Sequence, residues 1–174
     1  MDELNKDITI NIDGLGFVLY SEGNVEHIAE GSDFFESSFI EPDDVAKHIK
    51  KGDIIGFDTG SSGTYNIKLR TENINDEIYK NYPSSIRLGL EVKGGIVSII
   101  DLYWLMEWSK DIPQDQQFNL DNGFYELTVL TKIPESGIWG DNQEIYIFFE
   151  KKSKMPQLIW NGVPNLIWWY EENE

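Results

Sequence analysis

The sequence predicts a mainly β protein, an antiparallel β-sandwich or open barrel with one or two short helices. Roughly eight to ten short segments alternate apolar and polar residues, as strands with one buried face do. Turn residues separate these segments, and 13% of the residues are aromatic, a type that suits pleated surfaces. Short strands at this spacing favour a sandwich or barrel. We expect the 174 residues to form a single domain, residues 1–174.

The clearest pattern lies in residues 118–150. Alternate residues are apolar from Tyr125 to Val129 and again from Ile145 to Phe149, and an Asn-Gly turn precedes the first of these runs. The connection at 132–143 is too long for a tight hairpin. We therefore predict two paired strands at the centre of a sheet, with a projecting loop between them.

Four further hairpins are predicted from turn residues between apolar runs. Residues 8–21 turn at Asp13-Gly14, and residues 53–70 turn at the Gly- and Ser-rich segment 59–64. Residues 86–100 turn at Lys93-Gly94-Gly95, and residues 158–169 turn at Asn161-Gly162. We expect each pair of neighbouring strands to be hydrogen-bonded.

The best predicted helix spans Glu41 to Gly52. It has a proline in the first turn, acidic residues beside the positive end of its dipole, basic residues near its last turn and a terminal glycine. Residues 71–83 fit one turn of helix or a long loop. Residues 101–110 fit an extended start that runs into a helical turn, and residues 33–40 fit a short strand.

Charge is the strongest compositional feature. The chain has 31 acidic residues against 14 Lys and Arg, for a net charge of −17. Nucleic acids and anionic membranes would be repelled, whereas a basic protein would be attracted and steered. Solubility alone is the competing explanation for such a charge. The oligomeric state is not predicted.

We expect a cytoplasmic protein that uses no cofactor. The first residues are acidic where a secretory signal is basic, and no apolar run is long enough to span a bilayer. The sequence has no cysteine, which excludes disulfides and thiol chemistry.

No catalytic arrangement is apparent in the sequence, and we expect a protein that is not an enzyme. The segment Thr59–Thr64 lacks the lysine of a phosphate-binding loop. His48 fits the last turn of a surface helix, and His27 has no second histidine near it. Asp58 and Glu126 could point into a cleft as a pair of carboxylates, but a solvated strand face is the strongly preferred explanation for both.

A partner-binding site is the favoured functional hypothesis. Trp139 lies in a polar loop, and an exposed tryptophan surrounded by acids is typical of a binding hot spot for a basic partner. The alternative is that Trp139 folds back onto the sheet. We expect burial for the Trp168-Trp169 pair. The candidate partner-binding residues are Trp139, Glu135, Asp141, Glu144, Asp58 and Trp108.

Three segments carry a resemblance to a known family. They are Gly95–Ile99, Phe118–Thr128 and Glu144–Phe149, which resemble the bacterial nuclease-inhibitor family that includes competence protein J. The segment Gly60–Tyr65 resembles turns in small acidic immunity proteins of bacterial toxin systems. Residues after Lys151 have no counterpart. The resemblance implies an acidic β-sandwich that binds and neutralises a partner, a cognate toxin or nuclease, without a catalytic residue.

A second functional hypothesis stands beside the inhibitor. A β-sandwich could bind carbohydrate through tryptophan faces, or calcium through the Asp and Asn residues of its turns. No metal site is assigned, because the acidic residues do not have the spacing of a calcium-binding loop.

Overall fold

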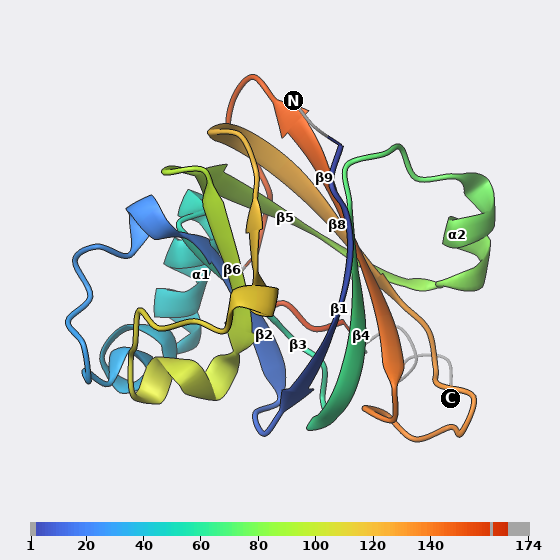
Figure 1. Cartoon of the computed structure of the whole chain (residues 1–174), viewed down its shortest axis with the longest axis horizontal. Coiled ribbons are helices and arrows are strands. Elements are labelled where there is room, and N and C mark those ends of the chain that lie inside the picture. Colours follow the sequence, from blue (N-terminus) through green and yellow to red (C-terminus); the bar gives the residue numbers. More distant parts are fainter. Residues whose placement is uncertain (1–2, 161, 167–174) are drawn as a thin grey trace.

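The computed structural model describes residues 3–160 and 162–166, which form a β-sandwich of two sheets (Figure 1). The first sheet has the order β1-β4-β9-β8-β5, and the second has the order β3-β2-β6-β7. The strand bounds are β1 Asn5–Ile12, β2 Gly16–Ser21, β3 Ile54–Asp58, β4 Gly63–Arg70, β5 Ser84–Val92, β6 Ile96–Asp101, β7 Gln117–Asn119, β8 Gly123–Thr131 and β9 Gln143–Lys152. Every pair of neighbouring strands is antiparallel except β4 and β9.

The helical segments are short. They are α1 Pro42–Lys51, α2 Asp76–Asn81, the 3-10 turns η1 Glu22–Asn24, η3 Leu102–Met106 and η4 Gln114–Gln116, and the π-helical turn η2 Phe35–Phe39. None of the helices in the described part of the chain is long and apolar enough to cross a membrane.

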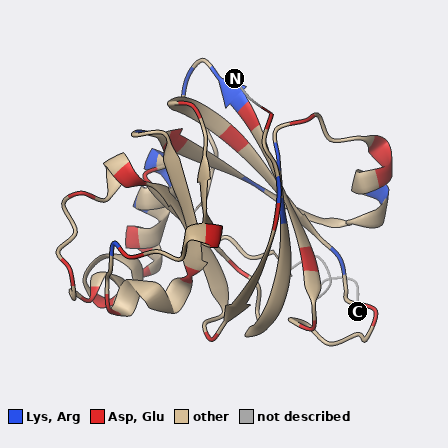
Figure 2. Cartoon of the chain, viewed as in Figure 1, with Lys and Arg blue, Asp and Glu red and all other residues tan. Residues whose placement is uncertain are grey.

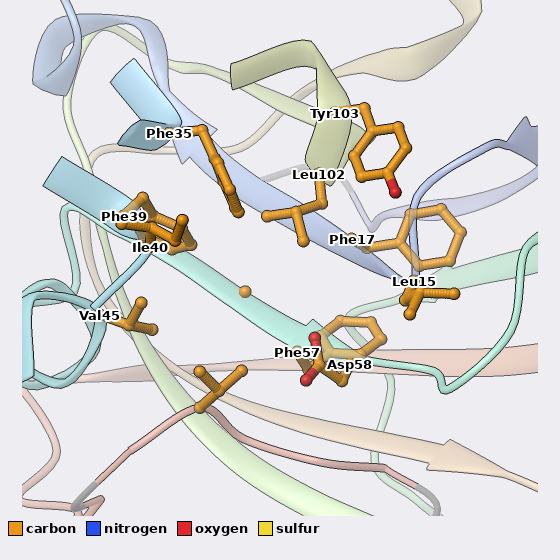
Figure 3. Close-up of a pocket in the computed structure, with 12 residues that line it drawn as sticks. Leu15, Phe17, Phe35, Phe39, Ile40, Val45, Phe57, Asp58, Leu102 and Tyr103 are labelled. Atoms are coloured by element: carbon orange, nitrogen blue, oxygen red, sulfur yellow. The ribbon is translucent and has the colours of Figure 1, made fainter. Parts of the chain in front are cut away.

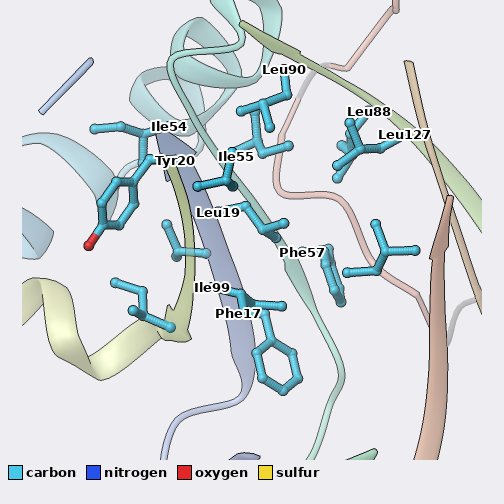
Figure 4. Close-up of a cluster of buried hydrophobic side chains, with 14 of the residues drawn as sticks. Phe17, Leu19, Tyr20, Ile54, Ile55, Phe57, Leu88, Leu90, Ile99 and Leu127 are labelled. Carbon is cyan, nitrogen blue, oxygen red and sulfur yellow. The ribbon is translucent and has the colours of Figure 1, made fainter. Parts of the chain in front are cut away.

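The core fills the space between the sheets and continues beneath the helices. Figure 4 shows Leu19 and Ile99 of the second sheet in one buried cluster with Leu88 and Leu127 of the first. All six residues of β2 are buried, so both faces of that strand are covered. The outer cover comes from α1 and the turns η2 and η3, whose apolar side chains belong to the same core. The second sheet is therefore the middle layer of the molecule.

The prediction for residues 118–150 is confirmed. Strands β8 and β9 pair over eight residues, from Phe124 opposite Lys152 to Thr131 opposite Ile145. β9 is the central strand of the first sheet, and the loop at 132–142 projects beyond it. Alternation in this unit gave the right pairing because one face of each strand is buried and the two strands are neighbours.

The hairpins predicted at 8–21, 53–70 and 86–100 are wrong as pairings, although all six strands exist. β1 pairs with β4 and β2 pairs with β3 and β6, so the turn at Asp13-Gly14 carries the chain from one sheet to the other. The turns after β3 and β5 also cross between sheets. Alternation shows that a strand has a buried face, but it does not show which strand lies beside it.

The remaining predictions concern single elements, and their outcomes differ. The helix at 41–52 is confirmed, with Pro42 in the first turn and Gly52 in the left-handed conformation after the last. Residues 71–83 contain α2, and residues 101–110 run from strand into the 3-10 turn η3. The strand expected at 33–40 is instead a π-helical turn. The hairpin at 158–169 lies partly outside the described residues, as do Trp168 and Trp169, and no strand occurs at 158–160 or 162–166.

Candidate functional site

Three loops meet at one end of the sandwich, and we call them together the loop end: residues 13–15, 59–62 and 132–142 (Figure 1). The Thr59 amide donates to the Leu15 carbonyl at 2.8 Å, which joins the first two loops. The Ser61 hydroxyl donates to the Trp139 carbonyl at 2.8 Å, which joins the second and third. The loops therefore form one connected surface.

Two glycines bring the second and third loops into backbone contact. The Thr64 amide donates to the Gly140 carbonyl at 2.8 Å. A Cβ atom on Gly63 would lie 2.1 Å from that same carbonyl oxygen, and Gly63 has a φ of 146°, which favours glycine. The Gly-rich segment at 59–64 thus allows the two loops to approach each other closely, in agreement with the prediction that this segment is a turn.

Three of the sequence-predicted acids gather at the long loop, two within it and Glu144 at the start of β9. Glu135, Asp141 and Glu144 line a hollow of about 450 Å³ together with Lys132. Figure 2 shows the acidic positions along this part of the ribbon. Glu135 and Asp141 are exposed, so their charges face solvent.

Glu144 differs from the other two acids because its carboxylate lies beside two lysines. The Tyr82 hydroxyl donates to Oε2, and the Nζ atoms of Lys68 and Lys132 lie 3.9 and 3.7 Å from the carboxylate oxygens. Burial, together with this hydrogen bond and the charge of Glu144, raises the pKa of Tyr82. Glu144 therefore ties β9 to the segment after α2 and is less free than Glu135 or Asp141 to contact a partner.

Trp139 is half-buried, whereas its neighbour Ile138 is 65% exposed. Ile133, in the same loop, is exposed as well. The sequence analysis singled out the tryptophan and missed both isoleucines. The signal that identified Trp139, a large apolar residue in a polar loop, applies to them equally.

Trp108 does not belong to the candidate surface, which corrects its place among the predicted partner-binding residues. It is 1% exposed and packs against Tyr20, with ring centroids 5.1 Å apart, and against Phe34 at 6.4 Å. The polar residues around it in the sequence suggested exposure, but the π-helical turn η2 and the segment before it cover this side of the second sheet.

A second hollow of about 310 Å³ opens beside the loop end (Figure 3). Among the described residues, Asp58, the last residue of β3, supplies the one carboxylate of this hollow, and no Lys or Arg lines it. The other lining residues come from β2, β3, η2, η3, α1 and neighbouring loops: Leu15, Phe17, Phe35, Phe39, Ile40, Val45, Gly56, Phe57, Leu102, Tyr103 and Val163. Sequence reasoning missed this apolar hollow because its walls come from segments far apart in the chain.

The carboxylate of Asp58 has an unusual environment. Figure 3 shows its oxygens beside Phe57 and within the ring of apolar side chains. Its backbone bonds to the chain near the C-terminus, since the Asp58 amide donates to Pro164 and the Asp58 carbonyl accepts from Leu166. Burial raises the pKa of Asp58. Among residues 3–160 and 162–166, no hydrogen bond or ion pair to its side chain occurs.

Asp101 positions two walls of this hollow. Its carboxylate accepts from the amides of Asp13 at 2.8 Å and Gly14 at 3.1 Å, which fixes the loop carrying Leu15. It also accepts from the Tyr103 amide at 3.1 Å, capping the turn η3. A Cβ atom on Gly14 would lie 2.5 Å from Asp101 Oδ1, so a larger residue there would displace this carboxylate. One carboxylate therefore holds both Leu15 and Tyr103, which are exposed at the mouth.

The histidine at 48 has a structural partner that the sequence did not indicate. His48 Nδ1 lies 2.8 Å from Asp53 Oδ1, and this carboxylate also accepts from the Ile54 amide at 2.7 Å. Burial raises the pKa of Asp53, but His48, Ile54 and Lys51 outweigh burial and lower it. The pair links the end of α1 to the start of β3. Ser37 and Ser38 line the same shallow hollow, yet neither hydroxyl bonds to His48 within the described chain.

Within residues 3–160 and 162–166, no group of three or more His, Cys, Asp or Glu residues is arranged to hold a metal ion. The calcium or carbohydrate module remains a prediction from sequence. The site described here is instead a surface: two hollows, exposed apolar side chains and acidic groups, all on one edge of a rigid sandwich. Such a surface suits contact with another macromolecule.

Comparisons with known proteins identify the fold. No protein-family model matches the chain, and no curated protein sequence matches it. The chain resembles in structure ComJ from Bacillus subtilis, described as an inhibitor of the DNA degrading activity of NucA, with 14% identity and a TM-score of 0.49, covering 87% of this chain and 100% of ComJ. It also resembles the product described as crocagin biosynthetic gene J, with 12% identity and a TM-score of 0.52, covering 85% of this chain and 98% of that one. At these identities the likeness concerns the fold alone.

Proposed function

We propose that this protein is a non-enzymatic inhibitor that binds and neutralises a basic protein, a nuclease, through its loop end and the adjoining apolar hollow. The observation that carries the proposal is the joint presence of exposed apolar side chains and unneutralised acids on one connected surface. The proposed activity is of the same class as that described for ComJ, an inhibitor of the DNA degrading activity of NucA.

The apolar part of this surface is unusually open. Ile138 is 65% exposed, Leu15 is 50% exposed and Ile40 is 48% exposed. Exposed apolar groups with a polar rim are typical of protein interaction sites, because contact with a partner removes them from water. A stable interface requires such a buried centre, since acidic groups at its rim contribute little affinity by themselves.

The acidic residues of this surface favour a positively charged partner. Asp58, Glu135 and Asp141 lie at the two hollows, and Lys132 is the one basic residue among the described residues that line them. The net charge of −17 extends this negative potential over the whole molecule. A basic protein would be drawn to this surface at an enhanced rate, and a nuclease is basic where it holds the phosphates of its substrate.

Capture of the partner tests the proposal. The immobilised protein is exposed to a lysate of the cells that produce it at about 0.01 M salt, and bound protein is eluted at about 1 M salt, where the Debye length falls from about 30 to about 3 Å. The expected result is a basic protein that degrades DNA. Retention of only acidic proteins, or of none, would contradict the proposal.

A matched pair of variants locates the binding surface. Glu135→Lys combined with Asp141→Lys reverses the two exposed acids of the long loop and should abolish capture. Asp115→Lys combined with Asp121→Lys makes the same change in net charge at exposed positions outside the loop end and should leave capture largely intact. Equal loss in both variants would mean that net charge alone, and no particular surface, holds the partner.

A further inference from the structure

We propose that the apolar hollow receives one arginine side chain of the basic partner, whose guanidinium group pairs with Asp58. This inference rests on the proposed function and names the group that the partner presents. Asp58 lies at the end of β3, and this inference puts it at the centre of the interface with the partner.

The shape of the hollow suits a single long side chain. Its volume of about 310 Å³ is small, at the lower end of the range of about 300–1,000 Å³ that holds small-molecule ligands. Leu15, Ile40 and Val163 provide aliphatic walls at the mouth, where all three are exposed. The methylene groups of an arginine stem would pack there while the charged end reaches inward.

The chemistry of the inner part selects arginine over lysine. Phe57 lies beside Asp58, and Phe17, Phe35 and Phe39 add further aromatic rings to the lining (Figure 3). A guanidinium group stacks on aromatic rings and binds a carboxylate through two parallel hydrogen bonds. It is also less strongly hydrated than an ammonium group, so its transfer into an apolar hollow costs less.

Charge complementarity fixes the sign of the occupant. Asp58 is the one charged residue among the described residues that line the hollow, and none of residues 3–160 and 162–166 forms an ion pair with its carboxylate. A carboxylate in such surroundings lacks compensation until an opposite charge arrives. Burial also raises the pKa of Asp58, in keeping with a carboxyl group that has no counter-ion in the described chain.

The probe for the experiment is N-acetyl-arginine amide, with N-acetyl-citrulline amide as its uncharged analogue of nearly identical shape. Each is titrated into the ¹⁵N-labelled full chain, and the amide resonances of Leu15, Gly56 and Asp58 are followed. The arginine probe should produce saturable shifts at these positions, and the citrulline probe should bind at least about tenfold more weakly. Equal shifts with both probes would overturn the proposal.

Asp58→Asn removes the charge and keeps the size of the side chain. It should weaken the arginine probe at least about tenfold. Asp121→Asn, which makes the same charge change in the turn before β8, should leave the affinity unchanged. Unchanged arginine affinity in Asp58→Asn, with a spectrum that shows an intact fold, would remove Asp58 from the proposal.

The two proposals fail separately. Capture of a basic nuclease by both wild type and Asp58→Asn, without any arginine-specific shift, would contradict the role of the hollow and leave the inhibitor function standing. Arginine-specific shifts that vanish in Asp58→Asn, with no basic protein captured, would support the cation site and contradict the inhibitor function.

Discussion

Asp58 occupies a position that costs folding free energy, because its carboxylate is half-buried among apolar side chains without a counter-ion in the described chain. Groups of this kind persist where binding uses them, since a partner that supplies the missing charge gains affinity from the same arrangement. Asp58 should therefore lower the stability of the free protein and raise its affinity for the partner, and both effects can be measured.

The first prediction concerns the stability of Asp58→Asn. Because the folded-state pKa of Asp58 is raised, the favourable contribution of its protonated form is complete below the unfolded-state pKa and is lost as pH rises through the folded-state value. Asp58→Asn should therefore be more stable than wild type at neutral pH, and the gain should shrink in acid. Urea unfolding at several pH values measures it. A variant less stable than wild type at pH 7 would show that Asp58 has a structural role.

The second prediction concerns the glycines that join the loops. Gly63→Ala should lower the free energy of unfolding by about 3 kcal/mol, because the new Cβ would meet the Gly140 carbonyl at 2.1 Å in a strained backbone conformation. At Gly137 the φ angle is 76°, but a Cβ atom added there would meet no atom within 4 Å. Gly137→Ala should therefore lower the free energy of unfolding by only about 1 kcal/mol, through backbone strain. Similar losses in the two variants would show that the close contact between loops contributes nothing.

At the apolar hollow, the carboxylate of Asp101 joins two elements of the structure. It accepts hydrogen bonds from amides of the turn between β1 and β2 and of η3, so it fixes two segments that are far apart in the sequence in one relative position. The loop end is thus rigid where it meets the hollow, and a rigid binding surface loses less entropy on association.

The third prediction follows from this link. Asp101→Ala should lower the free energy of unfolding by about 2 kcal/mol, the scale of hydrogen bonds to a charged group. It should also weaken the arginine probe, since Leu15 and Tyr103 would lose their fixed positions. Denaturant unfolding and the probe titration measure the two effects. Asp101→Asn, which keeps one acceptor oxygen, is the control and should fall between wild type and Ala. Unchanged stability in Asp101→Ala would rule out the link.

Local signals predicted the elements well. Proline, acids, bases and glycine in the right order marked α1, and period-two alternation marked most of the strands. Pairing was predicted correctly only for β8 and β9, because there the strands adjacent in sequence are also adjacent in the sheet. At the hairpins predicted for 8–21, 53–70 and 86–100 the chain instead crosses between sheets, and turn residues such as Asp13-Gly14 look the same in a hairpin and in a crossing.

The candidate site was predicted in part for the same reason. Glu135 and Asp141 lie within one loop and Glu144 follows it at the start of β9, so their sequence proximity brought them together. Asp58 was identified as a carboxylate that could face a cleft, but the cleft itself is built by distant segments. Trp108 was misplaced because the residues that cover it, Tyr20 and Phe34, are far away in the sequence.

The whole molecule carries a charge of −17, and this charge acts on stability and on association in opposite directions. Repulsion among like charges destabilises the folded state, whereas the same field attracts a basic partner from a distance. Added salt screens both effects.

The fourth prediction is that salt stabilises the free protein and slows its association. The melting temperature should rise with ionic strength, and the association rate constant for the captured partner should fall at least about tenfold between about 0.01 M and about 1 M salt. The dissociation rate should change much less, because it depends on short-range contacts. Differential scanning calorimetry and surface plasmon resonance provide the two readings. An association rate independent of salt would contradict electrostatic steering.

Neutralisation of a nuclease is tested most directly by titrating the protein into a DNA-degradation assay of the captured partner. Wild type should stop degradation at a stoichiometric ratio, and Glu135→Lys combined with Asp141→Lys should not, while Asp115→Lys combined with Asp121→Lys behaves as wild type does. Degradation that continues at saturating wild-type protein would contradict an inhibitory role for the loop end.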